Sequence, residues 1–220
     1  MRVAAIVPAY NEENRLASTL KAIQEIPEIN IILVVNDGST DRTPEIAREC
    51  RVQVIDLPTN MGKGEAINRG VRGVEADIFV FLDADLGDTA REATRILMPV
   101  LNGEADLCIA KFPPPKKKGG IGMVKRLASW GIAREGMNAQ EPLSGQRAMT
   151  SQVLQDVLPF HSGFGIEVGM TIRALRKGYR VIEVPVEMSH AETGRNLKGF
   201  IHRGRQFLDV ARVILAENRR

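Results

Sequence analysis

The chain has 220 residues, 44% of them hydrophobic and two of them cysteines, which suits one globular domain and argues against a disulfide framework or a structural zinc site. No apolar stretch reaches the roughly 18 residues needed to cross a bilayer, and Pro8 ends the first apolar run too early for a signal peptide, so we expect a protein of the reducing cytosol. The net charge of +3 is unevenly distributed: residues 1–110 contain 18 acidic and 11 basic residues, whereas residues 111–220 contain 9 acidic and 19 basic residues. An aromatic content of 5% argues against a nucleic-acid partner.

The first 110 residues alternate short apolar runs with helical patterns. The apolar runs predict strands at 3–7, 31–35, 52–56, 78–82 and 106–110. Helical periodicity predicts helices at 12–26, 43–50, 64–73 and 91–101, and Asn11 is the expected N-cap of the first of them. Regular alternation of apolar strands with helices predicts an α/β fold of Rossmann-like type, with a mostly parallel sheet flanked by helices.

The second half departs from this pattern. The proline- and lysine-rich segment 112–120 is expected to be a loop. Helices are predicted at 123–132, 165–177 and 200–217, and a strand at 181–186. The last helix is amphipathic, and its expected core face is Phe207, Val210, Ile214 and Leu215. We predict a single domain over 1–220.

Polar clusters follow four of the predicted strands, at the point where each strand ends. They are Pro8–Glu13, Asn36–Asp41, Asn60–Glu65 and Asp83-Ala84-Asp85. Ligands of open α/β sheets bind at the carboxyl ends of the strands, so these four clusters are expected to surround one pocket.

Asp83 and Asp85 are the clearest candidates for a metal site. Alternate residues of an extended segment point to the same side, so both carboxylates can face one ligand. Paired carboxylates repel each other unless a cation lies near them, and oxygen ligands suit Mg²⁺ or Mn²⁺. The alternative is an exposed turn before a helix, but the position at the end of an apolar strand favours the metal site.

Lys63 lies in a Gly-Lys-Gly turn. The turn lacks the spacing of a phosphate-binding P-loop, because Glu65 stands where Ser or Thr would follow, and no GxGxxG follows the first strand. A P-loop ATPase and a dinucleotide-binding fold are therefore disfavoured. Two interpretations of Lys63 stay open: contact with a diphosphate, and a plain surface turn.

Taken in order, the four clusters resemble the successive signatures of family 2 glycosyltransferases with the GT-A fold. The resemblance implies that residues 1–110 bind a nucleotide sugar and that 111–220 bind the acceptor. Its implied donor contacts are Pro8, Ala9, Tyr10, Glu12 and Asp37 around the nucleoside, Gly62, Lys63 and Ala84 nearby, and Asp83 on the ribose or sugar. The implied ligand of Mg²⁺ or Mn²⁺ is Asp85.

Two later segments, Glu141–Arg147 and Gly163–Gly169, resemble the acceptor side of glucosyl-3-phosphoglycerate synthases and their mannosyl relatives. This resemblance implies that His190 completes the metal shell and that Gly145 lines the substrate site. Arg195 could hold an acceptor phosphate or close over the donor diphosphate, and a basic, solvated start of the last helix is the alternative interpretation. The basic, apolar segment 112–133 resembles instead polyprenyl-phosphate sugar transferases, whose acceptor lies at the membrane. A flexible lid is the alternative interpretation of that segment.

We therefore expect a metal-dependent glycosyltransferase that moves a sugar from a donor of UDP-glucose or GDP-mannose type to a phosphate-bearing acceptor such as 3-phosphoglycerate. Asp83, Asp85 and Glu167 are its predicted catalytic residues. Glu167, or else Glu141, would serve as base for a hydroxyl acceptor, whereas a phosphate acceptor needs none. The alternatives are a polyprenyl-phosphate sugar transferase at the inner face of the membrane, a sugar-phosphate nucleotidyltransferase, and a non-catalytic nucleotide-sugar-binding module. Pairing of the last helix across a homodimer is also left open.

Overall fold

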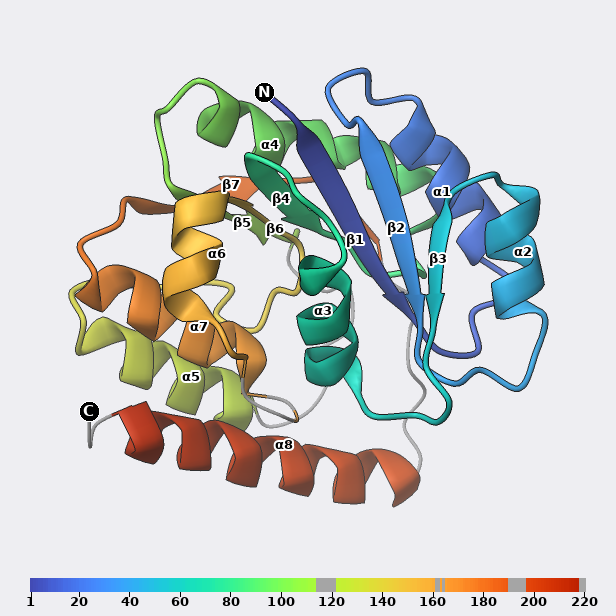
Figure 1. Ribbon diagram of the computed structural model, residues 1–220. Helices are drawn as coiled ribbons and strands as arrows, with labels where there is room; N and C mark the ends of the chain where they lie inside the picture. Colours follow the sequence, from blue (N-terminus) through green and yellow to red (C-terminus); the bar gives the residue numbers. More distant parts are fainter. Residues whose placement is uncertain (114–121, 161–162, 164, 190–196, 218–220) are drawn as a thin grey trace.

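A seven-stranded sheet runs through the middle of the computed structural model, which describes residues 1–113, 122–160, 163, 165–189 and 197–217 (Figure 1). The strands are β1 Val3–Ala9, β2 Ile31–Asn36, β3 Gln53–Asp56, β4 Ile78–Phe81, β5 Leu107–Lys111, β6 Arg147–Thr150 and β7 Val181–Pro185. Their spatial order is β3-β2-β1-β4-β6-β5-β7. Strand β6 is antiparallel to β4 and β5, and the other pairs are parallel. The predicted single α/β domain with a mostly parallel sheet is confirmed.

Helices cover both faces of the sheet, which explains why its central strands are apolar throughout. One face carries α1 Leu16–Gln24, α2 Thr43–Glu49, the 3₁₀ helix η1 Gly87–Glu92 and α4 Ala93–Leu101. The other face carries α3 Lys63–Arg72, α6 Ser151–Val157 and α7 Ile166–Arg176. In β1, Ala5 and Val7 pack toward the first layer, whereas Ala4 and Ile6 pack toward the second. This alternation follows from the two-residue period of a strand.

Two further helices form an outer layer against α7. They are α5 Met123–Ala133 and α8 Leu197–Glu217, and Figure 1 shows them stacked below α7. Buried residues of all three helices, such as Ala128, Ile172 and Val210, form one cluster. The contact between α5 and α8 is close, because a Cβ on Gly131 would lie 2.6 Å from the Cδ1 of Ile214.

The predicted core face of α8 is partly wrong. Val210 and Ile214 are buried as expected, but Leu215 is 61% exposed and Phe207 is only half-buried. Val213 and Glu217 take part in the contact instead. With Val210 and Ile214 they follow the i, i+3, i+4, i+7 spacing of one helix face, and Leu215 lies one residue beyond that face.

The start of α1 also differs from the prediction. The helix begins at Leu16 rather than at residue 12, and Asn11 does not cap it. Asn11 has a positive φ of 55°, and its side-chain oxygen accepts a hydrogen bond from the backbone N–H of Thr40 at 2.9 Å. Asn tolerates this left-handed conformation better than most residues, so Asn11 joins the loops after β1 and β2.

Strand β6 and helix α6 were not predicted. β6 is four residues long and begins with the charged Arg147, so it lacks the apolar run by which the other central strands were found. Thr150 caps α6 by accepting the N–H of Val153. Within the described ranges, no helix is both long and apolar enough to span a membrane.

Candidate active site

The acidic motif after β4 lies at a switch point of the sheet. From β1 the chain adds β2 and β3 on one side, whereas β4 pairs with the other side of β1. The parallel strands of Figure 1 therefore bring their carboxyl ends to one edge. In doubly wound sheets the crevice at such a switch point binds the ligand. The segments after β1 and β4, which carry Tyr10 and Asp83, flank this crevice.

Thr19 of α1 holds the turn that contains both aspartates. Its hydroxyl, which is fully buried, donates to the carbonyl of Ala84 at 2.8 Å and accepts the N–H of Gly87 at 2.8 Å. Arg15 adds a hydrogen bond of 3.2 Å to the carbonyl of Asp85. The backbone around Ala84 is thus fixed from α1, and the carboxylate of Asp83 contacts Lys63 and Gln146.

Each carboxylate oxygen of Asp83 accepts a hydrogen bond. Lys63 Nζ lies 2.6 Å from Oδ1, and Gln146 Nε2 lies 2.9 Å from Oδ2. Lys63 comes from the start of α3 and Gln146 from the residue before β6. Asp83 is therefore held by contacts from both halves of the chain.

Lys63 is shared between two carboxylates. Besides Asp83, its ammonium group lies 3.5 Å from Oε1 of Glu167, whose side chain is 11% exposed. Burial lowers the pKa of Lys63, but the charges of Asp83 and Glu167 outweigh burial and raise it above its usual range. Lys63 consequently stays protonated, so it carries a permanent positive charge in the crevice.

Gly145 lies directly against this ion pair. A Cβ at this position would lie 2.3 Å from Lys63 Nζ and 3.3 Å from Oδ2 of Asp83. Any side chain here would have to displace the lysine, so glycine is required by close approach rather than by an unusual φ.

Asp37 is buried, with 3% exposure, and positions the loop that leads to Lys63. Its two oxygens accept the N–H groups of Met61 and Gly62 at 2.7 and 2.8 Å. The predicted role of Asp37 at the nucleoside stays a prediction. Its contacts here also order the turn before α3.

The pKa of Glu12 is raised by burial and by the carboxylates that surround it, including Asp85. Burial raises the pKa of the Glu12 carboxyl, and the negative charges of Asp85, Asp83 and Asp41 add to that rise, opposed by Arg15. A cation near these carboxylates would relieve their mutual repulsion. These carboxylates supply oxygen donors, which Mg²⁺ and Mn²⁺ prefer.

Arg147 anchors the loop of residues 140–146 through hydrogen bonds to its backbone. It is fully buried, and it donates to the carbonyl of Ser144 at 2.8 Å, to that of Pro142 at 3.4 Å and to the Thr171 hydroxyl at 2.8 Å. Glu183 accepts the N–H groups of residues 140 and 141 at 2.9 and 2.7 Å. The buried Arg147 and the half-buried Glu183 thus hold the loop that presents Gly145.

The remaining predicted site residues divide between described and undescribed parts of the chain. Ala9 is buried, Pro8 is half-buried and Tyr10 is 46% exposed at the end of β1. His190 and Arg195 lie outside the described residues. Over the described ranges, no group of three or more His, Cys, Asp or Glu side chains has the arrangement of a metal site. The roles of all these residues stay predictions.

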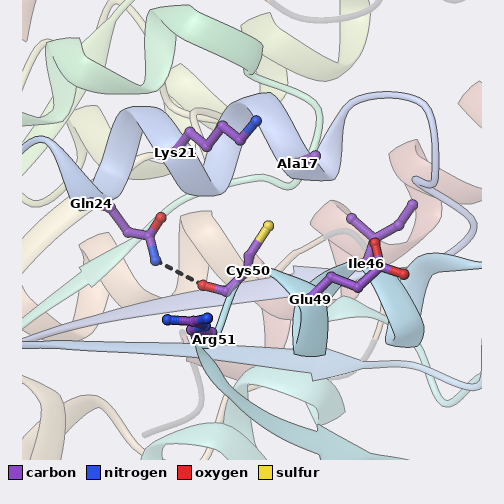
Figure 2. Close-up of a pocket in the computed structure, with 7 residues that line it drawn as sticks. All are labelled: Ala17, Lys21, Gln24, Ile46, Glu49, Cys50 and Arg51. Carbon is purple, nitrogen blue, oxygen red and sulfur yellow. Dashed lines mark hydrogen bonds between the residues drawn. The ribbon is translucent and has the colours of Figure 1, made fainter.

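The open groove in Figure 2 lies elsewhere. Its volume is about 510 Å³, and its lining is Ala17, Lys21, Gln24, Ile46, Glu49, Cys50 and Arg51. The amide of Gln24 donates to the carbonyl of Cys50 at 2.9 Å. These residues belong to α1, to α2 and to the two positions that follow α2, and none of the predicted site residues is among them. The groove is therefore not part of the candidate site.

Comparison with known proteins identifies the family. The family model described as "Glycosyl transferase family 2" matches residues 4–165, which include all four strand-end clusters and Gly145. The chain belongs to glycosyl transferase family 2. The predicted family and the predicted class of enzyme, a glycosyltransferase that uses a nucleotide sugar, are confirmed. The match favours this class over the nucleotidyltransferase and the non-catalytic module.

Curated relatives differ in the acceptors that their names give. The chain is 32% identical over 213 residues to an undecaprenyl-phosphate mannosyltransferase of Micrococcus luteus, covering 89% of this chain and 87% of the relative. It is 29% identical to the glycosyltransferase AglJ of Haloferax volcanii and spans 61% of that protein's length. It is also 29% identical to a glucosyl-3-phosphoglycerate synthase of Mycolicibacterium smegmatis, covering 77% of this chain and 63% of the relative.

Solved structures of glucosyl-3-phosphoglycerate synthase from Mycobacterium tuberculosis are similar over almost the whole chain. One contains Mn²⁺, UDP-glucose and phosphoglyceric acid, and it matches with a TM-score of 0.81 and 26% identity over 98% of this chain and 79% of that chain. Another contains Mg²⁺ and UDP, with a TM-score of 0.81. The predicted GT-A fold is confirmed by this similarity.

Proposed function

We propose that this glycosyltransferase moves a hexose from a donor of UDP-glucose or GDP-mannose type to a phosphate-bearing acceptor. The observation that carries the proposal is the arrangement at the switch point, where Lys63, Gln146 and Gly145 meet Asp83. The arrangement places the permanent positive charge of Lys63 beside the oriented carboxylate of Asp83, next to the oxygen-rich turn of Asp85. A sugar diphosphate needs both features, because its phosphates are anionic and its sugar hydroxyls donate hydrogen bonds.

The donor's nucleoside would lie along the ends of β1 and β2. Pro8, Ala9 and Tyr10 offer apolar and aromatic surface there, and Glu12 and Asp37 offer hydrogen-bond acceptors. The backbone around Gly62 and Ala84 would border the diphosphate and the sugar. Asp83 would hold the ribose or the sugar through the carboxylate that Gln146 and Lys63 keep in place.

Asp85 and His190 would hold the divalent cation, Mg²⁺ or Mn²⁺. The carboxylates around Glu12 fit such an ion, as the raised pKa of Glu12 indicates. Ser189 supports the assignment of His190, since its N–H donates at 3.2 Å to the hydroxyl of Thr89, four residues beyond Asp85. When bound, a divalent cation neutralises charge that develops on the leaving diphosphate.

Lys63 would stabilise the same negative charge by moving from Asp83 toward the diphosphate. The carboxylate of Glu167 already lies 3.5 Å from the ammonium group of Lys63, so we assign it to position Lys63 rather than to act as the base. This favours an acceptor that is already an anion. A polyprenyl phosphate meets that condition, because its phosphate oxygen is the attacking group, whereas 3-phosphoglycerate would react through a hydroxyl that needs a base. Arg195 would bind the phosphate of either acceptor.

The acceptor is 3-phosphoglycerate in the first version of this proposal and a polyprenyl phosphate in the second. The mycobacterial structure with UDP-glucose and phosphoglyceric acid supports the first. The relative from Micrococcus luteus supports the second, because this chain covers 87% of its length.

A transfer assay tests the proposal. UDP-glucose and GDP-mannose are each offered with Mn²⁺ and with 3-phosphoglycerate or undecaprenyl phosphate, and the glycosylated product is measured. We expect product from one donor–acceptor pair. Removal of Mn²⁺ by chelation should stop the formation of that product. Lys63→Met should reduce the rate about 100-fold, as loss of one electrostatic contact to a leaving group commonly does. An active Lys63→Met variant, or no turnover of any sugar donor, would contradict the proposal.

A further inference from the structure

Helix α5 presents an exposed row that combines large apolar and basic side chains. Met123 is 53% and Trp130 is 54% exposed, and Arg126 and Arg134 are also exposed. Their spacings of three, four and four residues place them on one face of the helix. The guanidinium of Arg134 lies 5.2 Å from the centre of the Trp130 ring.

The opposite face of α5 accounts for the helix's contribution to the core. Ala128, Gly131 and Ile132 are buried and pack in the cluster shared with α7 and α8. The exposed row therefore does not contribute to that packing. Two large apolar and two basic side chains on one exposed helix face are the composition of an interaction surface.

The charge of this face is one-sided. Residues 123–134 contain Lys125, Arg126 and Arg134 but no acidic residue. The nearest acidic groups along the chain are already paired: Glu135 lies 2.7 Å from Arg176, and Glu141 lies 2.6 Å from Lys125. The row thus favours a negatively charged partner surface.

We propose that the row of Met123, Arg126, Trp130 and Arg134 docks peripherally on an anionic lipid bilayer. Tryptophan has an apolar ring and one polar N–H, which suits the boundary between headgroups and acyl chains. Arginines on the same face attract anionic headgroups, and a bilayer tolerates a single helix lying in its plane. Charge complementarity selects this partner, and the inference does not depend on the proposed transfer reaction.

Docking would bring the acceptor side of the site close to the headgroups. The Ser129 hydroxyl donates to the carbonyl of Ala139 at 2.9 Å, and Lys125 donates to Glu141. These contacts attach α5 to the loop of residues 140–146, which presents Gly145 beside Asp83. The surface row and the candidate site are thus connected through α5 and this loop.

Trp130 is the only tryptophan of the chain, so its fluorescence reports on this surface alone. The full chain is titrated with vesicles of phosphatidylcholine containing 30% phosphatidylglycerol and, separately, with pure phosphatidylcholine vesicles. We expect a blue shift of the emission, quenching by brominated acyl chains and co-sedimentation with the anionic vesicles. Pure phosphatidylcholine should produce much weaker effects.

Charge-reversal variants distinguish binding through this face of α5 from non-specific attraction of the whole protein to anionic lipid. R126E/R134E should lower partitioning onto the anionic vesicles roughly tenfold or more. The control R91E/R95E makes the same change of net charge at exposed arginines of η1 and α4, on the other face of the sheet, and should bind as the native chain does. Circular dichroism verifies that both variants fold.

Three results would overturn the inference. The first is unchanged Trp130 emission in the presence of anionic vesicles. The second is equal loss of binding in the two charge-reversal variants. The third is a blue shift that grows with protein concentration without vesicles, which would assign the row to a second copy of the chain. Sugar transfer to a water-soluble acceptor is measured separately, so failure of docking and failure of the proposed function are distinguishable.

Discussion

Substitution of Gly145 should affect the activity of the site far more than the stability of the fold. Its replacement by alanine puts a Cβ 2.3 Å from the Nζ of Lys63, which is the mobile end of a long side chain. The lysine can move at little cost to folding, but it then leaves Asp83. We predict that Gly145→Ala lowers the transfer rate at least about tenfold while the free energy of unfolding changes by less than about 1 kcal/mol. Steady-state kinetics and urea denaturation check the two parts.

Gly103 offers the opposite control. It has a positive φ of 70° and open space around its Cα, so Gly103→Ala introduces backbone strain without a clash. The variant should lose about 1 kcal/mol of stability and keep its full transfer rate. A Gly145→Ala enzyme as active as Gly103→Ala would contradict the role given to the close approach of Gly145.

Thr19 gives a second prediction at the scale of single residues. Thr19→Val keeps the shape of the side chain but removes the hydrogen bonds to Ala84 and Gly87. The buried carbonyl of Ala84 and the partly buried N–H of Gly87 lose their partner, so we expect a loss of about 2 kcal/mol in stability and weaker donor binding. Thermal unfolding and donor titration measure both effects. The neighbouring Ser18→Ala removes one exposed bond to Arg15 and should change neither.

Among the elements, the β5–β7 pair depends on an ionised carboxylate. Asp106, just before β5, accepts hydrogen bonds from the N–H, Nε and guanidinium Nη2 of Arg180 at 2.8, 3.2 and 3.0 Å. Hydrogen bonds from Arg180 lower the pKa of Asp106 below its ordinary value of 3.8, although burial opposes them. Folding therefore favours the carboxylate form.

The sign of the pH dependence follows from that lowered pKa. The contribution of Asp106 is complete above its ordinary pKa and disappears as the pH falls through the lower value of the folded state. We predict that Asp106→Asn costs roughly 1 kcal/mol at pH 7, since the pair is partly exposed, and that the difference from the native chain shrinks as the pH falls below 3.8 and through the lowered pKa of Asp106. Urea denaturation across pH measures it. A difference independent of pH would rule out this ion pair as the cause.

The elements also explain how far sequence could predict the fold. The apolar strands β1, β2 and β4 were predicted because burial on both faces leaves a continuous apolar run. Strand β6 was missed because Arg147, Ala148, Met149 and Thr150 form no such run, and the burial of Arg147 depends on Thr171 and two carbonyls from elsewhere in the chain. Leu215 was misplaced because apolar character alone does not fix the helix face.

The site residues also differ in how far the sequence predicts them. Asp83, Asp85 and Lys63 were predicted because each follows a strand end in a motif with family signatures. Gln146 gave no signal of its contact with Asp83, because that contact arises only when β6 inserts beside β4. Thr19 did give one: it is a polar residue on the apolar face of α1, between Leu16 and Ile23, and a buried polar residue needs a hydrogen-bond partner.

At the scale of the whole molecule, the two cysteines should report on folding. Cys108 is fully buried in β5, and burial raises the pKa of its thiol to about 12. Cys50 is half-buried at the end of α2, where burial also raises its pKa. We predict that Ellman's reagent at pH 8 modifies Cys50 slowly and Cys108 only after the sheet opens, so one thiol reacts in the native chain and two in urea. Rapid native labelling of Cys108 would contradict the observed core.

The most direct test of the central claim is a calorimetric titration of the donor with and without metal. The claim is that Asp85 supports a divalent cation that helps to bind a nucleotide-diphosphate sugar at the switch point. The native chain should bind UDP-glucose or GDP-mannose at least about tenfold more tightly with Mn²⁺ than with EDTA, as expected for an ion that bridges carboxylate and phosphates. Asp85→Asn should unfold at nearly the native temperature but lose the effect of Mn²⁺. Equal donor affinity with and without Mn²⁺, or an Asp85→Asn variant that responds to Mn²⁺ as the native chain does, would contradict the claim.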